Sequence, residues 1–142
     1  MYKHILIPLD NSPADEAILE HVKQLARVLG SKITLIHVAE GFAARYQESL
    51  NLAPSEEVMD DEKYLKKRKQ ELSQEGFSVN YFLDAGDPTS KIVEYAEKNQ
   101  CDLIAMPTHG HKIIKDILLG SVASNVRHNT DIPVLLIKSH KH

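Results

Sequence analysis

Asp102-Leu103-Ile104-Ala105-Met106 is an apolar run of strand length, and Pro107-Thr108-His109-Gly110 follows it directly. Nine residues after Gly110 come Gly120 and Ser121, which lead into a helix-like run from Val122 to His128. A strand that ends in a glycine-containing turn, with a Gly-Ser pair opening a helix, offers free backbone N–H groups and a hydroxyl to an anion. This stretch therefore predicts a strand, a turn and a helix that together bind phosphate.

Strand signals recur along the whole chain. Short runs rich in branched or aromatic residues predict strands at residues 4–9, 33–38, 79–83, 102–106 and 134–137. Most of these runs are apolar throughout, which is typical of parallel strands that are covered on both faces.

Helix signals lie between the strands. Ser12-Pro13 and Asp87-Pro88 each combine a capping residue with a proline in the first turn, and Gly30 ends the first of these helices. Two more helices are expected at about 55–75 and at roughly 120–129. Five strands with four interleaved helices predict an α/β fold, a doubly wound five-stranded parallel sheet with helices on both faces, Rossmann-like in its organisation.

Length, composition and charge exclude several classes of protein. At 142 residues and 42% hydrophobic, the chain fits one domain, residues 1–142. It has no apolar run long enough to span a bilayer and no signal-peptide core before Asp10, so we expect a cytoplasmic protein that does not bind membranes. A single cysteine, Cys101, cannot form an internal disulfide, which agrees with a reducing compartment. The formal charge of −3 argues against nucleic-acid binding.

One basic run is a local exception to that charge balance. Lys63, Lys66, Lys67, Arg68 and Lys69 follow a group of acidic residues on one predicted helix. Acids near the start of a helix and bases further along suit the helix dipole. A solvated helix face is therefore a better interpretation than a nucleic-acid patch.

The expected topology indicates where a ligand would bind. In doubly wound sheets, ligands bind beyond the carboxyl ends of the strands, where the strand order reverses. The residues at those ends are Pro8-Leu9-Asp10, Val38-Ala39-Glu40, Asp84-Ala85-Gly86 and Pro107 to Gly110. We expect them to converge on one edge of the sheet.

Several short motifs, in order, resemble one family. They are Ile5 to Asp10, Ile36-His37-Val38, Gly86-Asp87-Pro88, Thr108-His109-Gly110, Leu118 to Val122, and Pro133 to Ile137. The chain resembles universal stress proteins of the UspA-like family over essentially its whole length. The resemblance implies the adenine nucleotide alpha hydrolase-like sandwich, a Rossmann-like fold. Nucleotide-binding members carry a Gly-x2-Gly-x9-Gly-Ser/Thr pattern, and Gly110, Gly120 and Ser121 match three of its four named positions.

The resemblance also implies a ligand and its contacts. The ligand would be ATP or another adenine nucleotide, which could carry Mg²⁺. Asp10 would lie near the adenosine end, the Val38 backbone near the adenine edge, and Gly110, Gly120 and Ser121 at the phosphates. The full set of candidate binding residues is Pro8, Leu9, Asp10, Val38, Pro107, Thr108, His109, Gly110, His111, Gly120, Ser121 and Val122.

Pro107 departs from the family pattern. Proline has no N–H, so a ligand contact made by that amide would be missing. A charge-assisted hydrogen bond contributes about 1.5–3 kcal/mol, which corresponds to tenfold or more in affinity. We therefore expect weaker or reshaped nucleotide binding.

The histidine pairs and the long connection after the second strand are two further features of the sequence. His109 with His111, and His140 with His142, supply too few ligands for a metal site, so no metal site is expected. His111 and Lys112 could instead act as electrostatic partners of the phosphates. Residues 39–54 form a long connection that could cover the nucleotide or pack on a partner.

Three other functions can be compared with the sequence. A phosphoacceptor receiver domain would use Asp10, Asp84, Thr108 and Lys138, but the first strand ends in one acid where that site needs two. An enzyme is not expected, because neither a nucleophile elbow nor a Walker pattern occurs, and any ATP hydrolysis should be slow. A nucleotide-free universal stress protein, acting through dimerisation and contacts with an unknown protein partner, remains the alternative.

The last strand of the chain predicts a homodimer. Val134, Leu135, Leu136 and Ile137 form the final strand, which should lie at an edge of the sheet with no helix left to cover it. Pairing of this strand with its twofold copy would satisfy its backbone and bury its side chains. The resemblance implies the same dimer.

Overall fold

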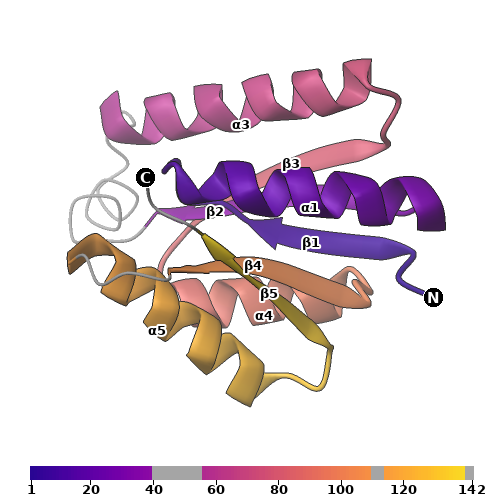
Figure 1. The fold of residues 1–142 in the computed structure, drawn as a ribbon. Coiled ribbons are helices and arrows are strands. Elements are labelled where there is room, and N and C mark those ends of the chain that lie inside the picture. Colours follow the sequence, from indigo (N-terminus) through magenta and orange to yellow (C-terminus); the bar gives the residue numbers. More distant parts are fainter. Residues whose placement is uncertain (40–55, 110–113, 140–142) are drawn as a thin grey trace.

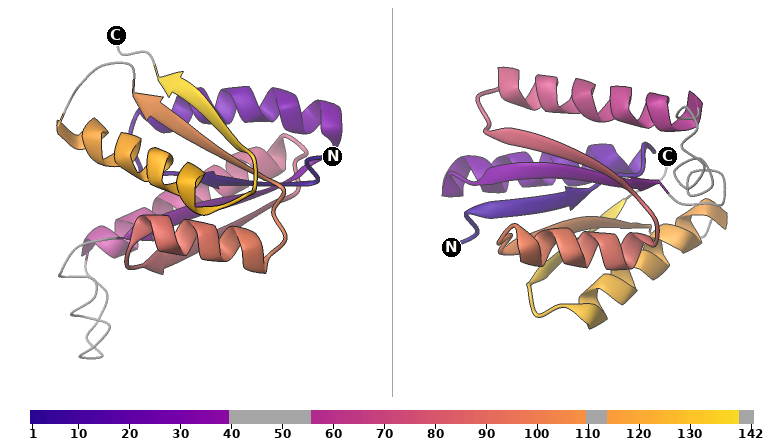
Figure 2. Two further views of the ribbon diagram at one scale, coloured as in Figure 1. Left: turned by 90° about the horizontal axis from the view of Figure 1, so that it is seen from below. Right: turned by 180° about the vertical axis from the view of Figure 1, so that it is seen from behind.

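The computed structural model describes residues 1–39, 56–109 and 114–139. Strands and helices alternate along the chain as β1 His4–Pro8, α1 Ala14–Leu29, β2 Lys32–Ala39, α3 Glu56–Gln74, β3 Val79–Ala85, α4 Pro88–Lys98, β4 Leu103–His109, α5 Ile114–Asn129 and β5 Val134–Ser139. All strand pairs are parallel, in the order β3-β2-β1-β4-β5. Helices α1 and α3 cover one face of the sheet, and α4 and α5 cover the other (Figures 1 and 2). The predicted doubly wound parallel sheet is confirmed.

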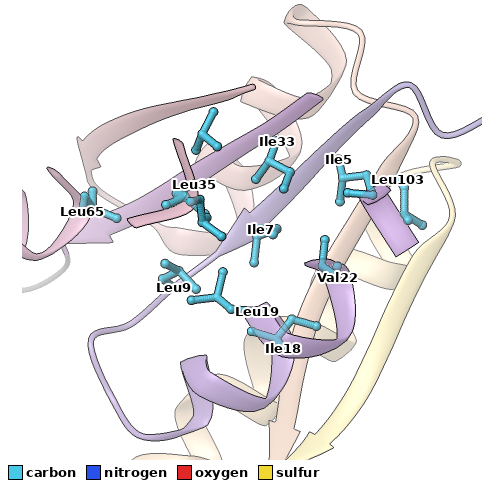
Figure 3. Packing of buried hydrophobic residues seen from close by; sticks show 14 residues of the cluster. Ile5, Ile7, Leu9, Ile18, Leu19, Val22, Ile33, Leu35, Leu65 and Leu103 are labelled. Carbon is cyan, nitrogen blue, oxygen red and sulfur yellow. The ribbon is translucent and has the colours of Figure 1, made fainter. Parts of the chain in front are cut away.

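Two apolar layers, one on each face of the sheet, explain why the strands are apolar throughout. Ile5 and Ile7 of β1 point to the layer under α1 and α3, where they pack near Ile18 and Val22 (Figure 3). Leu6, between them in sequence, belongs to the layer under α4 and α5. Successive strand residues alternate between faces, so a strand buried on both faces is mostly apolar on both. An exception is the buried Thr34 of β2, whose hydroxyl lies 2.7 Å from His4 Nε2.

The start of α4 and the end of α1 follow the predicted signals. The Asp87 carboxylate accepts a hydrogen bond from the Ser90 backbone N–H at 2.9 Å, which caps α4, and these bonds to Ser90 lower the pKa of Asp87. Gly30 ends α1 in the left-handed conformation with φ 69°. At the start of α1 the prediction is wrong by one residue, because Pro13 and not Ser12 occupies the capping position. Ser12 Oγ still accepts from the Ala14 N–H at 3.3 Å.

Helix α5 begins earlier than the sequence predicted. It starts at Ile114, so Gly120 and Ser121 lie inside the helix, and the expectation that they open it is wrong. A single glycine within a helix costs only about 1 kcal/mol relative to alanine, and this cost did not interrupt the helix. Backbone N–H groups within a helix bond to the carbonyls four residues earlier. The pair therefore does not offer the free N–H groups that were expected.

The strand order contradicts the receiver-domain alternative. In that class the order is 2-1-3-4-5, which places the third strand next to the first. Here β3 is an edge strand, separated from β1 by β2, so Asp84 is two strands away from Asp10. Asp84 Oδ1 instead accepts from the Ala85 N–H at 2.8 Å.

The two outer strands are β3 and β5. The predicted edge position of the last strand is therefore confirmed, and Leu136 on it is 37% exposed. Within the described part of the chain, no helix combines the length and the apolar character needed to cross a bilayer.

Candidate functional site

Strands β1 and β4 part at their carboxyl ends. They pair only at Ile5 with Leu103 and at Leu6 with Ile104. Beyond this point β1 stays with β2, and β4 stays with β5 as far as His109. Because the strand order reverses between β1 and β4, this parting is the topological switch point at which doubly wound proteins bind ligands.

A proline lies on each strand beyond the last shared pair. Pro8 ends β1, and Pro107 lies within β4. Pro107 and Thr108 were expected in a turn, but the structure keeps them in the strand, where they pair with Ile137 and Lys138 of β5. Proline cannot donate to a ladder and is tolerated where a strand is paired on one side only. Pro107 meets that condition, because β1 no longer pairs with β4 there.

The other predicted residues of this edge lie as follows. Leu9 is buried, and its N–H donates to the Ile36 carbonyl at 2.8 Å, so the chain follows β2 for one residue beyond β1. Asp10 is exposed, immediately after it. Val38 is buried near the end of β2, in register with Asp84. The structure thus brings the ends of β1, β2 and β4 to one edge of the sheet.

On α5, Ser121 is exposed and Val122 is half-buried against the second apolar layer. The position of Gly120 within the helix removes its expected role as a helix start. Two features of this pair can still serve a ligand: Gly120 has no side chain, and Ser121 is exposed.

Several expectations concern residues outside the described part of the chain. They are Gly110, His111 and Lys112, most of the connection over 39–54, and the pair His140 and His142. The backbone of His109 ends β4. Within the described residues, no group of three or more His, Cys, Asp or Glu side chains could hold a metal ion.

Asp15 organises the turn after β1, and sequence reasoning did not identify it. Its buried carboxylate accepts from the Asp10 N–H at 3.2 Å and from the Asn11 N–H at 2.9 Å. The Tyr64 hydroxyl of α3 donates to the same carboxylate at 2.6 Å. Burial raises the pKa of Asp15 to about 6, and the Tyr64 bond opposes that rise.

His37 ties the same turn to α3 at a second point. Its Nδ1 lies 2.7 Å from the Leu9 carbonyl oxygen, and its Nε2 lies 3.0 Å from an Asp61 carboxylate oxygen. Both partners only accept hydrogen bonds, so a protonated ring satisfies both and a neutral ring satisfies one. The only sequence signal for this link is the position of His37 near the end of a strand.

Arg68 extends the network along α3. Its guanidinium pairs with Glu16 of α1 and with Glu71, and its Nε donates to the Tyr64 hydroxyl at 3.2 Å. Within the basic run, Arg68 therefore stabilises the contact between α1 and α3, whereas Lys63, Lys66 and Lys67 are exposed. This agrees with the solvated-face interpretation for those three lysines.

We expect Asp15→Asn to change how stability depends on pH. The native pKa of about 6 lies above the ordinary 3.8, so the folded protein binds more protons than the unfolded chain between these values. Stability of the unmodified protein should therefore fall as pH rises through this window, by about 2–3 kcal/mol relative to Asp15→Asn. Urea unfolding of both proteins at several pH values from 4 to 7 measures the difference. Parallel stability curves would contradict the assigned pKa.

A separate open groove of about 590 Å³ lies between α4 and α5, lined by Asp87, Thr89, Ser90, Val93, Glu94, Glu97, Asn125 and Asn129. None of the predicted binding residues that the structure describes lines it. Asp87 is already engaged in capping α4, and Glu97 accepts from the Thr130 hydroxyl at 3.1 Å. Its acidic lining does not suit a phosphate ligand.

The parallel sheet, with its strand-end site at the switch point, defines a doubly wound α/β protein of the Rossmann-like class. Comparison with known proteins identifies the family. The model of the universal stress protein family matches residues 1–138, and the chain belongs to that family.

Three relatives illustrate the similarity. Universal stress protein MJ0577 of Methanocaldococcus jannaschii is 33% identical, over 97% of this chain and 96% of its own. The solved structure of MJ0577 covers 100% of this chain and 99% of its own, with a TM-score of 0.82. A universal stress protein from Archaeoglobus fulgidus in complex with dAMP has a TM-score of 0.72 at 21% identity, covering 96% of this chain and 98% of its own. One in complex with cAMP has a TM-score of 0.68 at 20% identity, covering 96% of each chain.

Proposed function

We propose that this chain is a cytoplasmic stress-response or signalling module that binds ATP or another adenine nucleotide, in a form that can carry Mg²⁺. The observation that supports it most is the parting of β1 and β4 after Leu6 and Ile104. This parting gives a nucleotide an entrance between strand ends at the switch point, where the fold class binds such ligands.

Different residues are proposed to contact the sugar, the adenine and the phosphates of the nucleotide. Asp10 is exposed after β1 and can accept hydrogen bonds from ribose hydroxyls, while the backbone near Val38 serves the adenine edge. Gly110, Gly120 and Ser121 serve the phosphates. The structure leaves Ser121 exposed, so its hydroxyl is free to reach a phosphate oxygen or a metal-bound water.

Relatives support the ligand class. The universal stress proteins with dAMP and with cAMP share this fold, and both ligands contain adenine, a pentose (deoxyribose in dAMP, ribose in cAMP) and one phosphate. Because their identity to this chain is about one fifth, they support the class of ligand and not its number of phosphates.

We further propose that this module binds its nucleotide without rapid turnover. Hydrolysis needs a positioned water and groups that stabilise the transition state better than the ground state. The polar groups that surround the turn after β1 are already bonded to one another, as Asp15 is to Tyr64 and His37 is to Asp61.

Mass spectrometry of the protein, purified without added nucleotide, tests this function. The expected result is a co-purified adenine nucleotide in roughly equimolar amount, lost on denaturation. The alternative function, a nucleotide-free universal stress protein that acts through dimerisation and protein contacts, predicts an empty protein. The exposed Leu136 on the outer strand β5 is the observation that favours this alternative.

Pro107→Gly is expected to tighten nucleotide binding by up to about tenfold, because it supplies an amide that proline lacks. Pro107→Ala is the matched variant, since it supplies the same amide without the flexibility that glycine adds to a strand. Isothermal titration calorimetry with ATP and magnesium measures both. Unchanged or weaker affinity in both variants would show that the missing amide does not limit binding.

A further inference from the structure

Asp15 is the one acidic side chain that is fully buried within the described part of the chain. Burying a carboxylate is costly unless several donors compensate it. Three donors do so here: the backbone N–H groups of Asp10 and Asn11 and the hydroxyl of Tyr64. The chain keeps a costly group at this place, next to the proposed nucleotide site.

These bonds do not serve as an ordinary helix cap. Asp15 lies in the first turn of α1, where a capping carboxylate would accept from N–H groups of that same turn. Instead it accepts from two residues that precede the helix. Asn11 has a left-handed backbone, φ 61°, a conformation that asparagine adopts more readily than most other residues except glycine. The Asp15 carboxylate accepts the Asn11 N–H in this conformation.

Helix α3 holds the same turn from the other side. Tyr64 donates to Asp15, and Asp61, one turn earlier on α3, accepts from the Asn11 side-chain amide at 3.4 Å. The turn that carries Asp10 is thus fixed between α1 and α3. A shift of α3 would change the bond that Tyr64 makes to Asp15, and through it the position of Asp10.

We propose that Asp15 is a positioning residue of the nucleotide site, which sets the Asp10–Asn11 turn in its binding conformation and, through Tyr64, makes that conformation depend on α3. This inference rests on the proposed nucleotide-binding function. Asp15 itself does not touch the ligand.

Tyr64→Phe is the principal test, because it removes one hydroxyl and leaves the ring in place. We expect ATP with magnesium to bind about three- to tenfold more weakly to this variant than to the unmodified protein. Asp15→Asn should weaken binding by tenfold or more, since the amide nitrogen then faces a backbone N–H. The double variant should bind no worse than Asp15→Asn, because both changes break one unit.

Tyr81→Phe is the matched control. The Tyr81 hydroxyl of β3 also bonds to a carboxylate of α3, that of Glu62, at 3.4 Å, but it does not contact the turn after β1. This variant should bind ATP as the unmodified protein does. Equal losses in Tyr64→Phe and Tyr81→Phe would overturn the proposal and indicate a general loosening of α3.

A pH profile separates positioning from a merely structural role. With a pKa of about 6, Asp15 becomes protonated below that pH and can no longer accept from all three donors. The affinity ratio between the unmodified protein and Asp15→Asn should therefore approach one between pH 7.5 and pH 5. The groups that face this carboxylate are Asp10 on the turn and Tyr64 with Arg68 on α3, while His37 and Asp61 bond beside it. These groups and the ATP phosphates are present in both proteins, so Asp15→Asn serves as the reference at each pH. A ratio that is constant with pH would overturn the proposal.

One readout needs no nucleotide. Hydrogen exchange of the Asp10 and Asn11 amides in the ligand-free protein should be faster in Tyr64→Phe than in Tyr81→Phe. If the unmodified protein bound no ATP, the proposed nucleotide-binding function would fail. The claim that Asp15 positions a nucleotide site would then fail as well. Exchange would then still show whether Asp15 and Tyr64 order the turn. If ATP bound and the two tyrosine variants exchanged equally, the positioning role alone would fail.

Discussion

Gly120→Val should abolish adenine-nucleotide binding, with at least a hundredfold loss in affinity, and leave the protein folded. Glycine is among the least favourable residues inside a helix, yet Gly120 lies within α5. A close approach of the phosphates to the helix backbone would explain its presence, because any side chain there would occupy their place. Valine suits a helix somewhat better than glycine, so lost binding could not be attributed to a weakened helix.

Ser124→Val provides the control for this loss. Ser124 lies one turn further along α5 and is exposed, so it receives the same side chain on the same helix. Calorimetry should find ATP binding unchanged in Ser124→Val and absent in Gly120→Val, while circular dichroism finds both folded. Normal binding by a folded Gly120→Val protein would remove Gly120 from the site.

We expect the chain to form a homodimer through β5, and Leu136→Lys should convert that dimer into a monomer at micromolar concentration. Strand β5 is an outer strand, and Leu136 on it is a large apolar side chain that is 37% exposed. An apolar edge strand leaves unpaired backbone groups, and pairing with a twofold copy would satisfy them. In such a dimer each lysine would lie in an apolar interface near its symmetry mate, where burying two like charges is strongly unfavourable.

The opposite edge of the sheet offers a matched control. Phe82 on β3 is 39% exposed, nearly the same as Leu136, and β3 is the other outer strand. Phe82→Lys should leave the dimer intact in light scattering and analytical ultracentrifugation, whereas Leu136→Lys should halve the mass. A monomeric unmodified protein at tens of micromolar would contradict the dimer directly.

Most of the fold could be predicted from local patterns. The positions of the strands could be predicted because residues such as Ile5, Leu6 and Ile7 are buried on alternating faces of the sheet, which makes the run apolar throughout. The start of α4 could be predicted because the capping residue Asp87 stands directly before Pro88, and Ser12-Pro13 placed the start of α1 to within one residue. The start of α5 could not be predicted from Gly120, because one glycine costs a helix little and does not mark its boundary.

The candidate site was only partly visible in the sequence. The strand-end residues could be named because parallel strands align their carboxyl ends, whatever the neighbouring side chains are. The roles of Asp15 and His37 could not be predicted, because they depend on partners far along the chain. Tyr64 is 49 residues from Asp15 in the sequence. No local pattern predicts that the helix with Tyr64 brings the tyrosine hydroxyl to the buried Asp15 carboxylate.

Calorimetric titration of the unmodified protein with ATP and magnesium, with GTP as the comparison, tests the central claim most directly. We expect one adenine nucleotide per chain with micromolar affinity, and at least tenfold weaker binding of GTP. No heat of binding for any adenine nucleotide up to millimolar concentration, from protein freed of co-purified ligand, would contradict a nucleotide site at the parting of β1 and β4.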